Sequence, residues 1–228
     1  MARAHFKPGL FKFLNDLAAN NNRDWFKTHA DRYEEQLRGP ALRFIEDFED
    51  RLHKISPHFL AAAKKSGGSL FRIHRDVRFS KDKSPYKTYT GIQFRHEEGK
   101  DAHAPGFYLH LQPREVFAGV GTWRPDTPTV TAIREGIVAD PAGWKKVIGG
   151  KRFRSTYELS GDALKRPPRG FDGDHALIDD IKRKDFIGVC RLDQKTVCAA
   201  TFDRDLATLF SAGAPLMRFL CNAVDVPF

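Results

Sequence analysis

Cysteine is scarce in this sequence, with three among 228 residues. The three stand at long spacings, with no C-x-x-C pair and no neighbouring pair of histidines; they are Cys190, Cys198 and Cys221. A structural zinc site needs four sulfur or nitrogen ligands at short spacings, so the sequence predicts no metal. Separate cysteines of this kind are instead typical of small buried side chains in a reducing compartment.

Long apolar runs are also missing. The segment Met1–Pro8 carries charge but lacks the apolar centre of a signal peptide, and no later stretch reaches the length of a membrane-spanning helix. The sequence therefore predicts a cytoplasmic protein without a membrane partner. It contains no internal repeat and no low-complexity linker, and we expect a single domain over residues 1–228.

Several familiar catalytic motifs are absent. The chain has no P-loop, no H-E-x-x-H and no G-x-S-x-G. Gly119 and Gly121 lack the third glycine of a dinucleotide-binding motif, so close strand packing explains this pair better. We therefore expect no cofactor, and no motif specifies a reaction.

Positive charge, by contrast, is plentiful and concentrated. With 38 Lys and Arg against 29 Asp and Glu, the formal net charge is +9, which attracts phosphates, nucleic acid or an acidic surface. Close to half of it falls in residues 71–88, where six cations and two acids give +4. The cations are Arg72, Arg75, Arg78, Lys81, Lys83 and Lys87, and the acids are Asp76 and Asp82.

The spacing of apolar residues predicts helices on both sides of a central β region. Helices are expected near residues 8–20, from 24 onward, and over 40–52, 127–139, 144–148, 175–184 and 203–224. Alternating runs predict strands at 70–79, 90–95, 106–112, 116–123 and 186–192. The connections are too short for parallel crossovers. We predict an α+β fold in which an antiparallel β-sheet of about residues 70–123 packs against N-terminal and C-terminal helices.

The first predicted strand is the candidate functional site. Its even-numbered residues would share one face of the sheet: Arg72, His74, Asp76 and Arg78. Polar residues of later strands would join them: Gln93, Arg95, Tyr108, His110 and Gln112. Guanidinium groups match phosphate oxygens bidentately, and the lysines of the following loop add charge. The competing interpretation is the solvated face of a one-sided sheet, which is either open or covered by residues 152–169.

Three functions are compatible with this site. The first is binding of a phosphate-bearing ligand, a nucleotide or a nucleic acid, by the six cations and Tyr108. The second is a metal-independent enzyme that acts on a phosphorylated substrate with His74 or His110 as acid or base. Asp76 is a further catalytic candidate, although it equally suits the orientation of an arginine. The third is a protein-interaction module with a basic face.

Several stretches carry a resemblance to a known family. The N-terminal one is Phe13-Leu14-x-x-Leu17 with Asn21-Asn22-Arg23-x-Trp25-Phe26. The central one is Phe71-Arg72-Ile73-x-Arg75-Asp76-Val77-Arg78-Phe79-Ser80-x-Asp82-Lys83-x-Pro85-Tyr86-Lys87. Later ones include Gly119-x-Gly121-x-Trp123-x-Pro125 and Lys184-Asp185-Phe186. Through these motifs nearly the whole chain resembles the domain-of-unknown-function 2461 family. The resemblance implies a single compact domain and brings no activity or cofactor with it.

Overall fold

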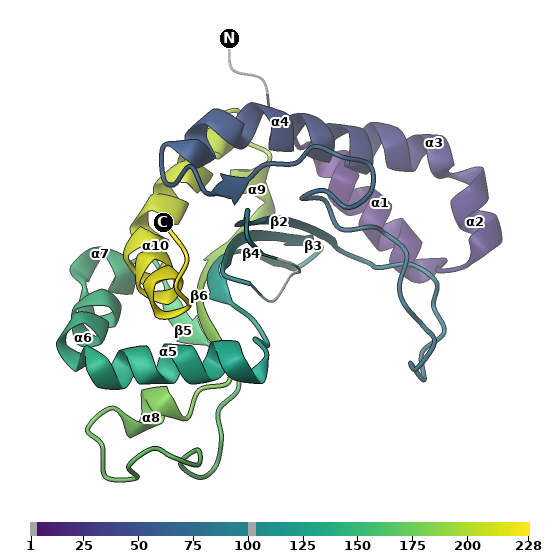
Figure 1. Ribbon diagram of the computed structural model, residues 1–228. Helices are drawn as coiled ribbons and strands as arrows, with labels where there is room; N and C mark the ends of the chain where they lie inside the picture. Colours follow the sequence, from purple (N-terminus) through teal and green to yellow (C-terminus); the bar gives the residue numbers. More distant parts are fainter. Residues whose placement is uncertain (1–3, 100–103) are drawn as a thin grey trace.

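A six-stranded sheet forms the centre of the computed structural model, which describes residues 4–99 and 104–228. The strand order is β1-β2-β3-β4-β6-β5, and every neighbouring pair is antiparallel. The strands are β1 (Phe59–Leu60), β2 (Thr90–His96), β3 (Gly106–Gln112), β4 (Glu115–Thr122), β5 (Glu158–Ser160) and β6 (Phe186–Leu192). With helices from both ends of the chain packed on it, this sheet confirms the predicted α+β class (Figure 1).

The helices precede, interrupt and follow the strands. They are α1 (Pro8–Ala19), α2 (Arg23–Thr28), α3 (Ala30–Tyr33), the π-helical turn η1 (Glu34–Arg38), α4 (Gly39–His53), α5 (Thr127–Ala139), α6 (Pro141–Gly149), α7 (Lys151–Arg154), α8 (Ile178–Ile181), α9 (Gln194–Val197) and α10 (Phe202–Ala223). The long predicted helices are confirmed because their apolar stripes face the core. The predicted helix over 175–184 is wrong, since only α8 forms there. The side chains of Asp172 and His175 accept hydrogen bonds from the N–H groups of Asp174 and Leu177, which hold the residues before α8 in turns.

The start of α2 differs from the prediction by two residues. The side-chain oxygen of Asn22 accepts a hydrogen bond from the Trp25 N–H at 2.9 Å. Asn22 rather than Asp24 is therefore the N-cap, because the capping side chain must reach the N–H groups of the first turn. Asp24 then lies inside that first turn, where its negative charge complements the helix dipole.

Helices α3 and α4 continue one another through η1 (Figure 1). Pro40 has no N–H to donate within the helix, and just before it the Gly39 N–H bonds to the Glu34 carbonyl oxygen, five residues back. A Cβ atom on Gly39 would lie 2.8 Å from that same oxygen. The lack of a side chain at Gly39 therefore lets the widened turn form.

The core lies between the sheet and the helices α1, α4 and α10. Phe210 of α10 packs on Phe94 and Phe107, with ring centroids 6.1 and 4.8 Å apart. Phe48 of α4 lies 5.1 Å from Phe94. All four side chains are fully buried, and each contributes about 1.5–3 kcal/mol to stability through burial. This cluster fixes both helices on one face of the sheet and leaves polar residues to the other.

The predicted strand over 70–79 is wrong. Leu70 forms an isolated bridge to Ile92, and the Phe71 N–H donates to the Gly91 carbonyl oxygen at 2.9 Å. Beyond Phe71 the chain leaves the sheet, because antiparallel pairing from the Leu70–Ile92 bridge carries it past Thr90, where β2 begins. The alternating residues therefore do not share a sheet face with Tyr108 or His110. The residues affected are Arg72, His74, Asp76 and Arg78.

Candidate functional site

Residues 71–88, called the arm below, form an extended double segment that projects from the body beside α2 (Figure 1). Its two halves are linked to each other. His74 and Tyr86 form a bridge, and the Arg75 N–H donates to the Pro85 carbonyl oxygen at 2.9 Å. The Lys87 N–H donates to the Ile73 carbonyl oxygen at 2.7 Å. The arm thus pairs with itself instead of extending the sheet.

The base of the arm is fixed to α2 and to the turn that precedes it. The Asn21 side chain donates to the Tyr86 carbonyl oxygen at 2.9 Å and accepts from the Tyr86 N–H at 3.1 Å. Phe26 of α2 stacks on the Tyr86 ring, with centroids 4.1 Å apart. The Asn21 side chain therefore pairs with both the N–H and the carbonyl oxygen of Tyr86, 65 positions away. The motif that contains Asn21 and Phe26 thus positions the arm.

Two ion pairs shape the distal part of the arm. The Asp76 carboxylate accepts from Nε and Nη2 of Arg78 at 2.9 and 2.6 Å, a bidentate pair. Arg75 pairs with Asp82 and also donates to the Ser84 carbonyl oxygen at 3.2 Å. Asp82 in turn accepts from the N–H and the hydroxyl of Ser84. Both acids of the arm therefore orient arginines, the structural role that the sequence suggested for Asp76.

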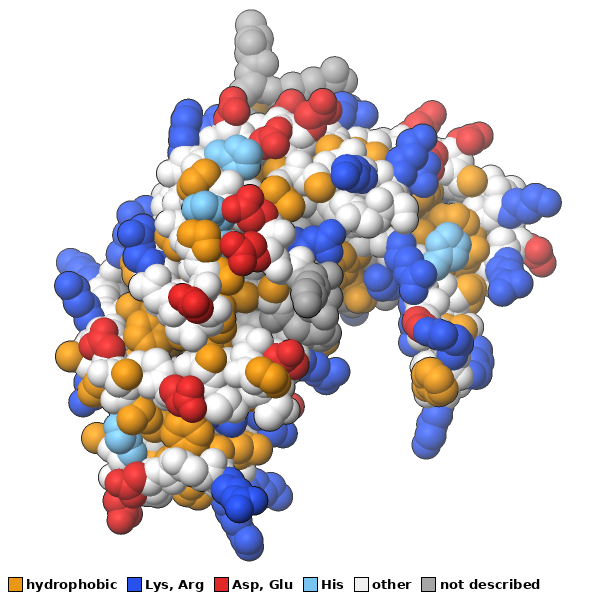
Figure 2. Space-filling model, in the orientation of Figure 1, with side chains coloured by type: hydrophobic (Ala, Val, Ile, Leu, Met, Phe, Trp, Pro, Cys, Tyr) orange, Lys and Arg blue, Asp and Glu red, His pale blue; other side chains and the backbone are white. Residues whose placement is uncertain are grey.

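The cations of the arm reach solvent. Arg72, Lys81 and Lys83 are exposed, and the Arg78 side chain is 76% exposed. Arg75 and Lys87 are half-buried. Figure 2 shows Lys and Arg side chains gathered along the projecting arm. Since all six belong to one segment, the arm brings together the cationic residues that the sequence singled out.

Hydrogen bonds keep the two acids of the arm ionised well into the acid range. The Arg78 guanidinium, followed by the Arg78 N–H, lowers the pKa of Asp76 to about 2. The hydroxyl and N–H of Ser84, and then Arg75, lower the pKa of Asp82 to about 2. Both carboxyls are therefore charged at neutral pH, and the net charge of the arm is the +4 counted from its sequence.

The Asp76 carboxyl is expected to titrate with a midpoint near 2 in the folded protein, against an ordinary value of 3.8. Because the folded pKa is depressed, the pair with Arg78 stabilises the arm fully above pH 3.8 and is lost as the pH falls towards 2. The carboxyl carbon chemical shift, followed by NMR against pH, measures this midpoint. In Arg78→Gln the midpoint should rise, and an ordinary midpoint in the unaltered protein would contradict the pair.

A pocket of about 540 Å³ lies at the base of the arm. Arg75, Lys87, Asp76 and Asp82 line it, so two cations face two acids. The other lining residues are Ala18, Asn21, Ser84, Tyr86, Thr88 and Tyr89. Burial, and then the charge of Arg72, lowers the pKa of Lys87. The balanced charges of this pocket do not favour a strongly anionic ligand inside it.

Phe71, which begins the arm, and Tyr89, which follows it, cover part of the polar sheet face. The Phe71 ring lies 5.9 Å from that of Tyr108, and Tyr89 stacks on His110 with centroids 4.7 Å apart. His110 is only 8% exposed as a result. Residues 152–169 do not provide this cover through β5, because β5 pairs with β6 and extends the sheet at its edge.

The two candidate acid–base histidines lie in different places. Nδ1 of His110 is 3.1 Å from the Tyr108 hydroxyl, and its Nε2 is 3.1 Å from Oε1 of Gln112. Burial lowers the pKa of His110, which favours the neutral ring. His74 is exposed on the arm, with its ring 6.3 Å from that of Phe26. Tyr108 likewise belongs to β3 and lies outside the arm.

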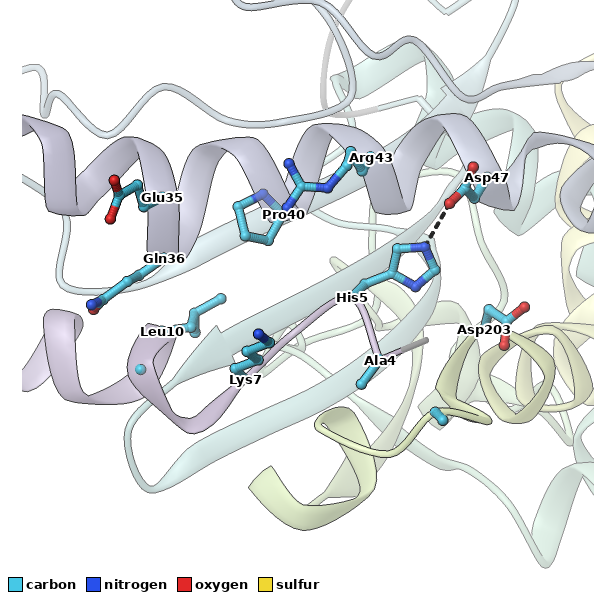
Figure 3. A pocket seen from close by; sticks show the side chains of 12 residues that line it. Ala4, His5, Lys7, Leu10, Glu35, Gln36, Pro40, Arg43, Asp47 and Asp203 are labelled. Carbon is cyan, nitrogen blue, oxygen red and sulfur yellow. Dashed lines mark hydrogen bonds and ion pairs between the residues drawn. The ribbon is translucent and has the colours of Figure 1, made fainter. Parts of the chain in front are cut away.

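A larger pocket of about 730 Å³ lies between the N-terminal segment, η1, α4 and the start of α10 (Figure 3). His5 points towards Asp47 there, with Nε2 and Oδ2 2.8 Å apart. The other charged residues that line it are Lys7, Glu35, Arg43 and Asp203. Acids thus accompany the bases in this pocket. The arm, with its excess of positive charge, is the stronger candidate for an anionic ligand.

The remaining predictions concern cysteines, metals and membranes. All three cysteines are free thiols; Cys221 is buried, whereas Cys190 and Cys198 are half-buried. Burial raises the pKa of Cys221 to about 12, so its thiolate is disfavoured. Among the described residues, no group of three or more His, Cys, Asp or Glu is placed to hold a metal ion. In the same part of the chain no helix combines the length and apolar character needed to cross a membrane.

Reasoning from the sequence missed two contributors to the arm. The contact of Asn21 with Tyr86 spans 65 positions, and no local sequence pattern reveals it. The alternation over residues 70–79 predicts Phe79 on the apolar face of a strand, yet its side chain is 96% exposed. For Asn21, the N-terminal motif in which it stands is the sequence signal that points to a role. The exposure of Phe79 can be recognised only once the structure shows that residues 70–79 form no strand.

Fold and site together define an α+β protein with an antiparallel sheet and a projecting basic arm. The chain belongs to the family described as Conserved hypothetical protein (DUF2461), which matches residues 9–219. This match confirms the resemblance seen in the motifs, and it includes the whole arm. No curated protein and no solved structure matches the chain.

Proposed function

We propose that this protein binds a nucleic acid through the phosphates of its backbone, with the arm as the binding element. The observation that carries the proposal is the set of six cations against two acids in one projecting segment. Lys and Arg side chains that contact phosphates release condensed counterions, so each exposed cation adds to affinity. Because Asp76 and Asp82 orient Arg78 and Arg75, they favour a preorganised set of donors.

The shape of the arm supports an extended polyanion over a free nucleotide. Small ligands are normally held in concave pockets with convergent polar groups. The pocket at the base of the arm contains two acids as well as two cations, which weakens its attraction for a triphosphate or diphosphate. The exposed cations lie along the outside of the arm (Figure 2). A chain of phosphates can contact several of them at once.

The alternatives find less support. An enzyme with His110 as acid or base would need a free ring nitrogen, but both nitrogens of His110 have side-chain partners. His74 is exposed on the arm and lacks such an enclosed setting. A protein-interaction module would use the same basic surface with an acidic protein as partner. The free thiols of the three cysteines support a reducing, cytoplasmic setting for any of these functions.

Fluorescence anisotropy of a labelled oligonucleotide, titrated with the full chain at several salt concentrations, tests the proposal. The logarithm of the association constant should fall linearly with the logarithm of salt, with a slope of about −0.7 for each phosphate contacted on a single strand. Changing the base sequence should alter the affinity little. Absence of binding at low salt, or polyglutamate competing as well as the oligonucleotide per unit charge, would overturn the proposal.

A further inference from the structure

The distal part of the arm exposes a large aromatic side chain. Phe79 is 96% exposed, whereas the next most exposed large apolar side chain among the described residues, Trp123, is 50% exposed. Burial of a phenylalanine side chain stabilises a folded chain, and the exposed Phe79 ring does not contribute this free energy. A ring held almost wholly in solvent on a projecting segment is therefore available to a partner.

The surroundings of Phe79 indicate the chemistry of that partner. The Arg78 guanidinium carbon lies 5.8 Å from the centroid of the Phe79 ring, and the bidentate pair with Asp76 holds this guanidinium. Lys83 donates to the Val77 carbonyl oxygen at 3.0 Å, which brings a second cation to the same part of the arm. An aromatic ring flanked by cations suits a ligand that has both a flat π face and negative charge. Unpaired nucleotides have both.

We propose that Phe79 stacks on an unpaired nucleobase while the neighbouring cations contact the adjoining phosphates, so that the preferred ligand is single-stranded nucleic acid. This inference depends on the proposed function, and it names the form of nucleic acid. Stacking of this kind tolerates any base, because every base has a π face. Stacking on any base needs one aromatic ring, and the described residues at the tip of the arm, 76–84, contain no second aromatic side chain that could select one base.

An anionic membrane is the other surface that combines charge with apolar contact. Interfacial anchors bury an apolar face built from several large side chains. Among the described residues of the arm, Phe79 is the one large apolar side chain that is exposed. The cations also lie along both halves of the arm, as a strand of phosphates requires, instead of in one ring around Phe79. These observations favour the nucleic acid.

The test compares an oligothymidylate with an abasic oligomer of equal length, which keeps the phosphates but has no bases. Anisotropy titrations should show that the unaltered protein binds the oligothymidylate about tenfold or more tightly than the abasic strand, the effect expected of base stacking. Phe79→Ala should bind both strands equally, with the salt slope of the unaltered protein. Phe79→Trp should retain the preference, and its indole fluorescence should be quenched by the oligothymidylate.

Trp123→Ala is the matched control. Trp123 is also exposed and also lies against an arginine, with the Arg124 guanidinium carbon 4.6 Å from its ring, but it lies outside the arm. Its removal should leave the preference intact. Equal, salt-dependent binding of both strands by the unaltered protein would overturn stacking and leave backbone binding in place, whereas no binding of either strand would overturn the proposed function itself. Loss of binding to phosphatidylserine vesicles in Phe79→Ala, with the preference between strands unchanged, would assign Phe79 to a membrane and also overturn stacking.

Discussion

Replacing four exposed cations of the arm by alanine is expected to abolish most of the affinity for nucleic acid without unfolding the protein. The four are Arg72, Arg78, Lys81 and Lys83. If each contacts one phosphate of a single strand, the salt slope should become shallower by about 3, and a fourfold rise in salt should then weaken the unaltered protein about 50-fold more than the variant. Anisotropy titrations across a salt series measure both quantities.

The fold should survive these substitutions because none of the four side chains is buried. Arg78 loses its pair with Asp76, and Lys83 loses its bond to the Val77 carbonyl oxygen, so the change is confined to the distal arm. The contacts of Asn21 and Phe26 with Tyr86 at the base remain. Circular dichroism and the thermal midpoint should therefore match those of the unaltered protein.

A charge-matched control separates local from overall charge. Four exposed cations on α6 and α7 lie on the opposite side of the molecule from the arm (Figure 1). They are Lys145, Lys146, Lys151 and Arg152. Their replacement by alanine removes the same net charge and should change the salt slope little. If the two variants weaken binding equally, the affinity comes from overall charge and the arm is not the binding element.

The largest expected effect on stability comes from Gly121→Ala in β4. Gly121 has φ +127°, and a Cβ atom there would lie 2.0 Å from the Phe186 carbonyl oxygen. The substitution must strain the backbone or push β6 away from β4, with a loss of about 2–4 kcal/mol from conformational strain and weakened strand pairing. For a chain of this size that corresponds to a fall of about 5–15 °C in the thermal midpoint.

Gly149→Ala provides the comparison for Gly121→Ala. Gly149 ends α6, and a Cβ atom there would meet nothing within 4 Å. Alanine has the higher helix propensity, so this change should leave the thermal midpoint unchanged or raise it slightly. Calorimetry of both variants gives the comparison. An equal, small effect of both substitutions would contradict the close approach of β4 and β6 at Gly121.

The same glycine shows what a motif search can reveal. The sequence attributes Gly119 and Gly121 to close strand packing, and the structure confirms this for Gly121 alone, since a Cβ atom at Gly119 would lie an ordinary 3.7 Å from Cβ of Tyr108. Gly119 lies opposite Tyr108 in the neighbouring strand β3, and Gly121 lies opposite Ile187 in β6. The sequence does not predict which strand lies beside Gly121. The contact joins β4 to β6, and Gly121 and Phe186 are 65 positions apart in the chain. A spacing within one strand says nothing about which strand lies beside it.

The sequence by itself determined the long helices, the strands β2, β3 and β4, and the concentration of charge in the arm. Apolar stripes on helices and antiparallel pairing of consecutive strands depend on residues that are near one another in the chain, so a short stretch of sequence is enough to predict them. Charge needs no structure at all to be counted. The α+β class followed from these local signals.

The tertiary structure alone decided that residues 71–88 form a projecting arm. Alternation of polar and apolar residues specifies two faces, but a strand also needs a free sheet edge with which to pair. Antiparallel pairing from the Leu70–Ile92 bridge carries residues 72–79 past Thr90, where β2 begins, so this stretch projects outward and pairs with residues 85–87 instead. Phe79 is exposed because this projecting stretch has no sheet to pack on. Asn21 anchors Tyr86 across 65 positions, a distance that no local sequence pattern records.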